Sequence, residues 1–543
     1  MTHGAFRVPV PANEPVRSYA PGSPERASLE AELARQAAEE VEVPLVIGGE
    51  EVHTGTTEPM VMPHDHGHRL GVFHQAGAPE VQRAIDAATE ARHDWERMPR
   101  EERAAIFLRA AELLATSWRD RVNAATMLNQ SKTVHQAEID SACELIDFFR
   151  YNVHYAERLY AEQPESGPGC WNRVEHRPLD GFVFAVTPFN FTSIAGNLPS
   201  APALMGNTVL WKPASTSVLS NYYLMKLFEE AGLPPGVINF VPGRGAAVGD
   251  PVLADPRLAG IHFTGSTAVF QGLWRTIGQR IADYRQYPRI VGETGGKDFV
   301  LAHASSDVEA LGVALLRGAF EYQGQKCSAA SRAYVPASLW ADVAVYLSDA
   351  LSEVRMGDVR EFGNFLGAVI DASSFRTQRE AIDAARAAPG VQILLGGECD
   401  DATGWFVQPT VLVTEDPRYD TMCRELFGPV LTVHVYEDAR FEEALELCAT
   451  TSEYGLTGAL FANDRAAVRR GTDALRFAAG NFYVNDKPTG AVVGQQPFGG
   501  SRASGTNDKA GSILNLLRWV SPRTIKETLA PPTDWRYPFL GPE

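Results

Sequence analysis

One cysteine of this chain lies where a thiol could act as a nucleophile. Cys327 occurs in EYQGQKCSAASRAYV, a polar, glycine-containing loop between an expected helix and an expected strand. Lys326 and nearby backbone amides could stabilise its thiolate, which is the reactive form of cysteine. The five cysteines without such a setting are Cys143, Cys170, Cys399, Cys423 and Cys448. On this pattern alone, Cys327 could still be an incidental loop thiol.

A carboxylate and an amide could serve the same chemistry. Glu293, in IVGETGGKDFV, follows an apolar run and precedes two glycines that allow close backbone approach. A carboxyl group in a partly apolar pocket has a raised pKa and could act as the base that activates water. Asn190, in VTPFNFTS, could donate a hydrogen bond to a developing oxyanion. The plain alternatives are a surface charge for Glu293 and a turn residue for Asn190.

Composition narrows the class of protein that carries these residues. The chain has 543 residues, of which 45% are hydrophobic and 21% charged, so we expect two or three domains. A formal net charge of −18 argues against a nucleic-acid partner. We expect no targeting leader, no membrane span and a cytoplasmic protein. The cysteines have no paired spacing, which argues against disulfides and zinc, so we expect no metal.

The hydrophobic pattern predicts the elements that position these residues. After a proline-rich surface arm over residues 1–45, three- and four-residue spacing predicts helices from Val81 to Leu159. Short apolar runs alternate with helical stretches over residues 181–265 and again over 299–462, which is typical of parallel βαβ units. Loops at the carboxyl ends of such strands bind ligands, so TPFNF, KPAST and FTGS are candidate cofactor loops.

Seven short motifs occur in an order that one enzyme superfamily shares. They are TPFNF, LWKPAS, FTGS, GETGGKD, GQKCSA, ELFGPV and PFGGSRASG. Across nearly its whole length the sequence resembles the aldehyde dehydrogenase superfamily, and the common order makes the match highly specific. The resemblance favours a nucleophilic Cys327 over an incidental thiol.

The resemblance implies an α/β fold of the aldehyde dehydrogenase type, with two Rossmann-like α/β domains and an oligomerisation arm made of a β-hairpin and the C-terminal tail. The expected parts are an NAD-binding domain over residues 1–160 and 179–292, a catalytic domain over 293–495, and the arm over 161–178 and 516–543. The chain lacks a full G-x-G-x-x-G after Ser266, so we expect the coenzyme to lie differently from the usual dinucleotide pose.

The resemblance also implies a mechanism. Cys327 would attack an aldehyde, and Asn190 with the Cys327 backbone N–H would hold the oxyanion of the hemithioacetal. Hydride would leave for the nicotinamide, and Glu293 would then activate the water that hydrolyses the thioester. The coenzyme contacts would be Lys212 and Ser215 at the adenosine ribose, Gly265 and Ser266 at the pyrophosphate, Glu425 at the nicotinamide ribose and Phe427 beside the nicotinamide.

Coenzyme preference depends on one departure from the superfamily pattern. Many NAD-preferring members carry a glutamate three residues after the lysine, where it would repel a 2′-phosphate, and this chain has Ser215. We expect NAD as coenzyme, with NADP as a secondary one. The backbone amides of FTGS, at the start of an expected helix, independently suit a pyrophosphate.

Five longer stretches resemble one branch of the superfamily, which oxidises L-glutamate γ-semialdehyde to L-glutamate in proline breakdown. They are NEPVRSYAPGSPER, VTPFNFTSIAGNLPSAPALMGN, ETGGKDFVLAHASSDV, EYQGQKCSAASRAYVP and DKPTGAVVGQQPFGGSRASGTNDKAG. The substrate residues that this branch implies are Glu144, Phe191, Ser328, Thr489, Gly490, Ala491 and Phe498. The amides of the 489–491 loop would bind the carboxylate, the phenylalanines would enclose the methylene chain, and Glu144 would favour the ammonium. Many relatives have serine where Ala491 stands, so this chain lacks one side-chain hydrogen bond.

Other functions remain open at this stage. An aldehyde dehydrogenase for another small semialdehyde, such as succinate semialdehyde, would keep all the chemistry. A cysteine hydrolase or acyltransferase would use Cys327 without redox chemistry, but no histidine lies near Cys327 or Glu293 in the sequence. A catalytically silent member would have lost the nucleophile or the base, and both are present. The expected partners are the small-molecule substrate, further copies of the chain in a dimer or larger assembly, and transiently a proline dehydrogenase.

Overall fold

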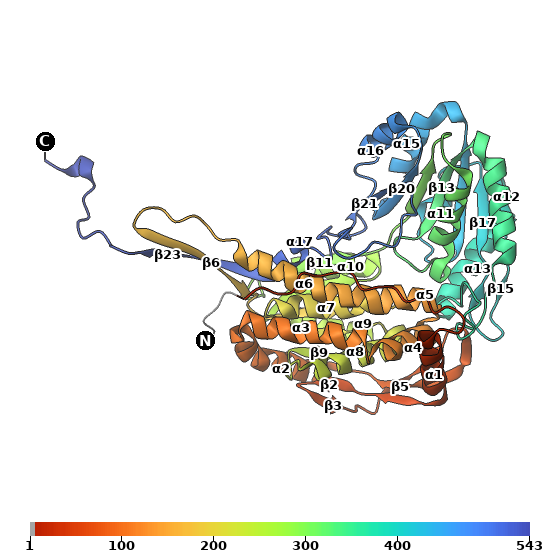
Figure 1. Ribbon diagram of the computed structural model, residues 1–543. Helices are drawn as coiled ribbons and strands as arrows, with labels where there is room; N and C mark the ends of the chain where they lie inside the picture. Colours follow the sequence, from red (N-terminus) through yellow and green to blue (C-terminus); the bar gives the residue numbers. More distant parts are fainter. Residues whose placement is uncertain (1–5, 543) are drawn as a thin grey trace.

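The computed structural model describes residues 6–542 and confirms the expected α/β class. Figure 1 shows a body with two α/β parts, one built on each of two seven-stranded sheets, and a narrow ribbon that extends from the body. The C-terminal segment continues beyond the ribbon, away from both sheets.

The first sheet has the spatial order β11–β10–β7–β8–β9–β2–β3. Its strands are β2 (Leu45–Ile47), β3 (Glu50–Val52), β7 (Phe182–Val186), β8 (Thr208–Lys212), β9 (Ile238–Phe240), β10 (Leu258–Thr264) and β11 (Arg289–Glu293). The strands from β11 to β9 are parallel, whereas β2 pairs antiparallel with both neighbours. The chain order therefore reverses between β7 and β10, and ligands bind at the carboxyl edge of a parallel sheet beside such a reversal.

Both faces of this sheet are buried, which explains the unbroken apolar run FVFAV of β7. Val183 and Ala185 pack into one core, whereas Phe182 and Phe184 pack into another. Strands buried on both faces read as continuous apolar runs because successive side chains point to opposite sides. The helices of this part are α1 (Pro24–Ala38), α2 (Ala78–Arg97), α3 (Arg100–Ala115), α4 (Arg119–Gln130), α5 (Val134–Ala137), α6 (Glu144–Ala161), α7 (Thr192–Leu204), α8 (Val218–Ala231), α9 (Gly245–Ala254) and α10 (Thr267–Gln279), with a π-helical turn at Glu138–Cys143.

The second sheet has the spatial order β14–β17–β18–β13–β12–β20–β21 and is parallel except at β14. Its strands are β12 (Asp298–Ala302), β13 (Ala330–Pro336), β14 (Val391–Leu395), β17 (Thr410–Thr414), β18 (Val430–Tyr436), β20 (Thr457–Phe461) and β21 (Asn481–Val484). Helices that belong to this part are α11 (Val308–Phe320), α12 (Ala337–Glu353), α13 (Ala372–Ala387), α15 (Phe441–Thr450) and α16 (Arg465–Ala474). Smaller elements are β15 (Cys399–Asp400), β16 (Phe406–Val407), α14 (Asp420–Cys423), β19 (Tyr454–Gly455), β22 (Ser501–Arg502) and α17 (Ile513–Leu517), with 3-10 turns at Ser215–Ser217, Glu321–Gly324, Asp438–Arg440 and Pro538–Leu540.

The protruding ribbon pairs two strands that are far apart in the sequence. Strand β6 (Cys170–Pro178) pairs antiparallel with β23 (Val520–Thr528) over nine residue pairs, from Val520 with Pro178 to Thr528 with Cys170. The segment 161–178, expected as a hairpin, contains one strand. The residues before it form a proline- and glycine-containing loop whose Gln163 side chain hydrogen-bonds to the backbone of Val174 without forming a second strand. The C-terminal segment supplies the second strand instead.

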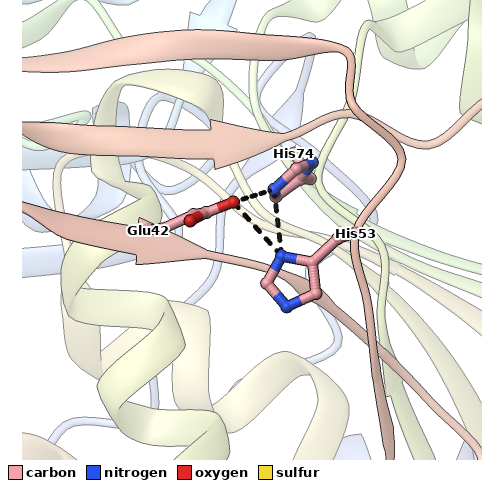
Figure 2. A group of neighbouring side chains, drawn as sticks. All are labelled: Glu42, His53 and His74. Carbon is pink, nitrogen blue, oxygen red and sulfur yellow. Dashed lines mark hydrogen bonds and ion pairs between the residues drawn. The ribbon is translucent and has the colours of Figure 1, made fainter.

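A small N-terminal sheet of β1 (Val41–Val43), β5 (Asp65–His74) and β4 (Thr57–Met62) carries a cluster of Glu42, His53 and His74. Glu42 Oε1 lies 2.7 Å from His74 Nε2 and 3.3 Å from His53 Nδ1. The three side chains point toward one another (Figure 2). His74 Nδ1 accepts hydrogen bonds from the backbone N–H groups of Thr54 and Gly55, each at 3.1 Å. Neutral His74 therefore carries its proton on Nε2, which donates to Glu42 and is not free to bind a metal. The cluster ties the 53–55 turn to β1 and β5.

Across residues 6–542, no helix has both the length and the apolar character needed to cross a bilayer. All six cysteines are free thiols in the structure.

Candidate functional site

Cys327 lies in a tight loop between α11 and β13. Tyr322, Gln323 and Gly324 have φ angles of 52°, 53° and 64°, so three successive residues adopt the left-handed conformation. A Cβ on Gly324 would lie 2.3 Å from the carbonyl oxygen of Gly428, so only glycine fits there. A left-handed run of this kind is costly and persists only where surrounding contacts hold it.

Buried side-chain hydrogen bonds supply those contacts. Gln323 Nε2 donates to the carbonyls of Ser131 and Ala368, and its Oε1 accepts from Gly367 N–H. Gln325 Oε1 accepts from the N–H of Ile370 at 2.9 Å. The loop is thereby fixed to the end of α4 and to the 367–370 segment, and it presents Cys327 in one position.

A cavity of about 740 Å³ lies along the carboxyl edge of the first sheet and ends at Cys327. This volume lies within the range of small-molecule and cofactor pockets. Seven of the residues predicted for the site line it: Asn190, Lys212, Gly265, Ser266, Cys327, Glu425 and Phe427. The strands β7, β8 and β10 end beside this cavity, so the sheet itself brings together residues from distant parts of the chain.

The walls of the larger cavity suit a dinucleotide. Ser266 is the N-cap of α10, and the helix start presents N–H groups and a positive dipole end to the cavity. A Cβ on Gly265 would lie 2.8 Å from the Phe263 ring, which explains the glycine. Lys212 Nζ donates to the Pro213 carbonyl, and burial lowers its pKa to about 8. Its remaining N–H donors are available for ribose oxygens.

Glu425 and Phe427 lie at the end of this cavity nearest Cys327. Glu425 Oε1 accepts a hydrogen bond from Gly296 N–H at 2.8 Å, and burial raises the pKa of this carboxyl group to about 7. Phe427 has a φ of 57° and lies edge-on to Phe189, with 5.8 Å between ring centroids. A carboxylate and an aromatic face at this end could hold a ribose and pack against a planar ring.

A second, smaller cavity of about 40 Å³ lies on the other side of Cys327. All the residues predicted to bind substrate line it, namely Glu144, Phe191, Ser328, Thr489, Gly490, Ala491 and Phe498. Ser328 Oγ donates to Thr489 Oγ1 at 2.9 Å, which joins the nucleophile loop to the 489–491 loop. Cys327 lines both cavities, so one thiol faces two separate binding spaces.

Buried charges surround the second cavity. Lys132 Nζ lies 2.8 Å from Asp140 Oδ2 and over the Phe191 ring, 4.4 Å from its centroid. Lys326 Nζ lies 3.7 Å from the same Asp140 oxygen. Glu144 accepts from Ser193 Oγ at 2.5 Å, and burial beside Asp140 raises the pKa of Glu144 to about 8. The space therefore offers positive and negative groups to a small polar ligand.

Asn190 lies in the wall of the larger cavity, whereas Glu293 does not. Asn190 lines the larger cavity with Cys327, and its Nδ2 donates to the Gln325 carbonyl at 3.0 Å, which leaves a second N–H on the same nitrogen. Glu293 lies at the end of β11 and lines neither cavity; its Oε2 accepts from Gly500 N–H at 3.0 Å. Burial raises the pKa of the Glu293 carboxyl well above its usual range.

The surroundings of Cys327 disfavour the thiolate form of its side chain. Burial, together with the negative charges of Asp298 and Glu293, raises the pKa of Cys327 well above its usual range. The adjacent Lys326, which the sequence suggested as a stabilising charge, instead forms ion pairs with Asp140 and Glu321. A nucleophilic Cys327 therefore needs a base or a bound cation to take its proton.

Most of the residues predicted from the sequence line one of the two cavities, but Glu293 and Ser215 do not. Ser215 begins the 3-10 turn after β8 and does not line the cavity, whereas its neighbour Ala214 does. Asp140, Ile194 and Lys132 were not predicted, although the first two line the smaller cavity. The mixed π- and α-helical segment that brings Asp140 beside Glu144 has no signal in the sequence.

Comparisons with known proteins agree with this geometry. Residues 51–525 match the profile described as the Aldehyde dehydrogenase family. The chain is 51% identical to delta-1-pyrroline-5-carboxylate dehydrogenase, mitochondrial, from Dictyostelium discoideum, over 99% of this chain and 98% of that protein. The crystal structure of the Mycobacterium tuberculosis delta-pyrroline-5-carboxylate dehydrogenase bound with NAD has a TM-score of 0.96 and 57% identity, covering 99% of this chain and all of that one. A Thermus 1-pyrroline-5-carboxylate dehydrogenase with bound NAD has a TM-score of 0.89 at 33% identity, over 97% of this chain and all of its own. This chain belongs to the aldehyde dehydrogenase family.

Proposed function

We propose that this protein oxidises L-glutamate γ-semialdehyde, the open form of 1-pyrroline-5-carboxylate, to L-glutamate with NAD as the oxidant. One observation carries the proposal: Cys327 lies between a cofactor-sized cavity and a small polar cavity lined by every residue expected to bind this aldehyde. The names of relatives that are about half identical to the chain over nearly its whole length support the same activity.

In this proposal, the residues around Cys327 divide the reaction into two steps. The thiolate of Cys327 attacks the aldehyde carbon, and the free N–H of Asn190 stabilises the oxyanion that forms. Loss of hydride converts this adduct to a thioester. Glu293 then removes a proton from the water that attacks the thioester, a role for which its raised pKa suits it. L-Glutamate leaves, and Cys327 is free again.

The larger cavity is the proposed coenzyme site. Lys212 would meet the adenosine ribose, with Ser215 just beyond the lining residue Ala214. Gly265 and Ser266 would meet the pyrophosphate, and Glu425 and Phe427 the nicotinamide riboside. When bound there, NAD supplies a hydride acceptor and a positive charge beside the thiol. NAD-bound structures of the relatives support this choice. Ser215 carries no carboxylate to repel a 2′-phosphate, so NADP is proposed as a secondary coenzyme.

The smaller cavity would hold the amino-acid end of the substrate. Gly490 has a φ of 92°, and loops with glycine in this conformation expose backbone N–H groups that bind carboxylates. Phe191 and Phe498 offer apolar faces to the short methylene chain. Glu144, with a pKa of about 8, would lose its proton and accept hydrogen bonds from the α-ammonium of the substrate.

Substrate preference tests the proposal directly. We expect kcat/KM for L-glutamate γ-semialdehyde to exceed that for succinate semialdehyde by at least about tenfold, because one charge-assisted hydrogen bond contributes about 1.5–3 kcal/mol. Succinate semialdehyde keeps the aldehyde, the two methylenes and a carboxylate but lacks the ammonium-bearing α-carbon, so it measures what that carbon and its ammonium contribute. Production of NADH measured at 340 nm gives both constants. A preference for succinate semialdehyde would contradict the assignment.

Activity should rise with pH. Cys327 and Glu293 both work as the deprotonated form, and the structure raises the pKa of both groups. Their active forms therefore become more populated as pH increases, and kcat/KM should climb from about pH 6 to about pH 9. An aldehyde without a titrating group, such as propanal, isolates the enzyme's own ionisations. A rate that falls over this range would show that neither group acts as proposed.

Assembly and location complete the proposal. The 161–178 and 516–543 segments form the proposed oligomerisation arm, beside an NAD-binding domain over 1–160 and 179–292 and a catalytic domain over 293–495. Large apolar side chains are exposed on the arm, which is typical of an interface: Trp171, Leu529, Trp535, Tyr537 and Phe539. A homodimer or larger assembly fits this surface. A cytoplasmic location and a transient contact with a proline dehydrogenase remain predictions, since several relatives are named as mitochondrial.

A further inference from the structure

The N-terminal arm lies outside the segment that matches the family profile, yet it reaches the substrate cavity's wall. The match begins at residue 51, whereas the contacts in question start at Asn13. Residues 6–20 form neither helix nor strand, and this segment hydrogen-bonds to α4 and α6 through Glu14. The arm is therefore packed and hydrogen-bonded as part of the fold.

Asn13 uses both ends of its amide group. Its Nδ2 donates to Asp147 Oδ2 and to the Val493 carbonyl, each at 2.8 Å. Its Oδ1 accepts from Tyr151 OH at 3.3 Å and from Gln495 Nε2 at 2.9 Å. Two of these partners lie on α6 and two in the segment that follows the 489–491 loop. The half-buried amide of Asn13 thus connects α6 to a loop residue, Val493, that lies 480 residues after Asn13 in the sequence.

Both connected elements form walls of the smaller cavity. Glu144 lines that cavity from the first turn of α6 and lies three residues before Asp147, so the two side chains share one side of the helix. Gly490 and Ala491 line it from the loop, two to three residues before Val493. The Asn13 contacts therefore join the loop to the helix that carries Glu144.

A second contact brings the same two elements together. Gly494 has a φ of 83°, and a Cβ at this position would lie 2.2 Å from the ring of Tyr151. The loop backbone thus packs directly on α6 beside the Asn13 amide. Any side chain at position 494 would push the loop away from α6, so only glycine fits where the loop contacts the helix.

The arm is itself anchored, so Asn13 is held in place. Glu14 N–H donates to Asp147 Oδ1 at 2.7 Å, and the Glu14 carboxylate pairs with Arg119 and Arg150 at 2.6 and 2.8 Å. Further along the arm, Tyr19 OH donates to the buried carboxylate of Glu138 at 2.9 Å. Ion pairs that are buried and fully hydrogen-bonded fix geometry more strongly than exposed ones.

We infer that Asn13 is a positioning residue for substrate specificity, which sets the spacing between α6 and the 489–491 loop and so the fit of the amino-acid end of the aldehyde. This inference rests on the proposed function, because it concerns the same substrate. Asn13 touches neither Cys327 nor the larger cavity. Its effect should be confined to aldehydes that carry a carboxylate and an ammonium group.

The test compares two aldehydes in the full-length enzyme. For Asn13→Ala we expect KM for L-glutamate γ-semialdehyde to rise about tenfold, since all four hydrogen bonds that join α6 to the segment after the 489–491 loop are lost. The kcat for this substrate, the KM for NAD and the kcat/KM for propanal should stay within about twofold, because the chemistry and the coenzyme site are untouched. A general loss of structure would lower all of these together.

Two further variants make the result decisive. Gln495→Ala removes an exposed partner of Asn13, so it should fold and raise the same KM about threefold. Tyr19→Phe is the matched arm control: it deletes one hydrogen bond of the arm but keeps the Glu14 contacts directly beside Asn13 and all of Asn13's own hydrogen bonds, so its KM should change by less than about twofold. If KM is unchanged in both Asn13→Ala and Gln495→Ala, the inference about Asn13 is wrong, whereas the proposed function still holds. A wild-type enzyme that oxidises propanal but not the semialdehyde overturns the proposed function, and this inference with it.

Discussion

Replacement of Cys327 by alanine should abolish aldehyde oxidation while leaving coenzyme binding intact. The thiol forms the covalent bond on which both proposed steps depend, so its loss should lower kcat at least about 10⁴-fold. The larger cavity has many other lining residues, from Lys212 to Glu425, so affinity for NAD should change little. Stopped-flow or steady-state NADH production measures the first quantity, and fluorescence titration with NADH measures the second.

Cys448→Ala is the matched control for this experiment. Cys448 is also a fully buried thiol, but it belongs to the core that packs α15 and α16 on the second sheet. Its replacement removes the same atom and should lower stability by about 1 kcal/mol without changing kcat. If Cys327→Ala keeps more than a small fraction of the activity, another group must act as the nucleophile. Catalysis would then not depend on a thioester at Cys327.

The sheets were predictable because burial on both faces leaves a strong pattern. Runs such as FVFAV and the alternation of apolar runs with helical stretches pointed to parallel βαβ units, and β7, β8 and β10 lie where these patterns place them. The ribbon was not predictable in the same way. Strand β6 is mostly polar and has no buried position, and its partner β23 lies over 340 residues later, so neither strand carries a signal for the other.

The candidate site was predictable where a motif fixes the local backbone. Ser266 caps α10 because a serine after a strand is a strong start signal for a helix, and Cys327 follows α11 as its glycine-containing loop suggests. The charges around the smaller cavity were missed. Lys132 and Asp140 meet only because a buried π-helical turn shifts the helix register, and no local pattern announces such a turn.

The position of Glu293 also required the structure. The sequence placed a carboxylate at a strand end beside two glycines, but it could not show which backbone it would meet. In the structure, Glu293 accepts from Gly500 N–H, which belongs to the PFGGSRASG motif more than 200 residues away. A base held away from the two cavities can let the thiol react first and then reach the water that ends the cycle, because a side chain can change rotamer faster than enzymes turn over.

That sequence of events gives Glu293→Gln a distinctive expected result. Glutamine keeps an oxygen that accepts from Gly500 N–H, so the fold should be preserved, but it cannot take a proton from water. Thioester formation should continue, while its hydrolysis should slow by about 10²–10⁴-fold. We therefore expect a burst of NADH equal to one per active site, followed by a slow steady rate. Mass spectrometry should detect the acyl group on Cys327 after the burst.

Hydroxylamine separates this outcome from a general loss of activity. As a strong nucleophile, it attacks the thioester without a base, so it should restore turnover in Glu293→Gln but not in Cys327→Ala, where no thioester forms. Slow turnover without a burst would mean that Glu293 acts before the thioester, as the group that takes the proton of Cys327. Because the pKa values of Cys327 and Glu293 are both raised, one carboxylate could take the proton of the thiol and later that of the water. The presence or absence of the burst shows which of these two steps limits the rate in Glu293→Gln.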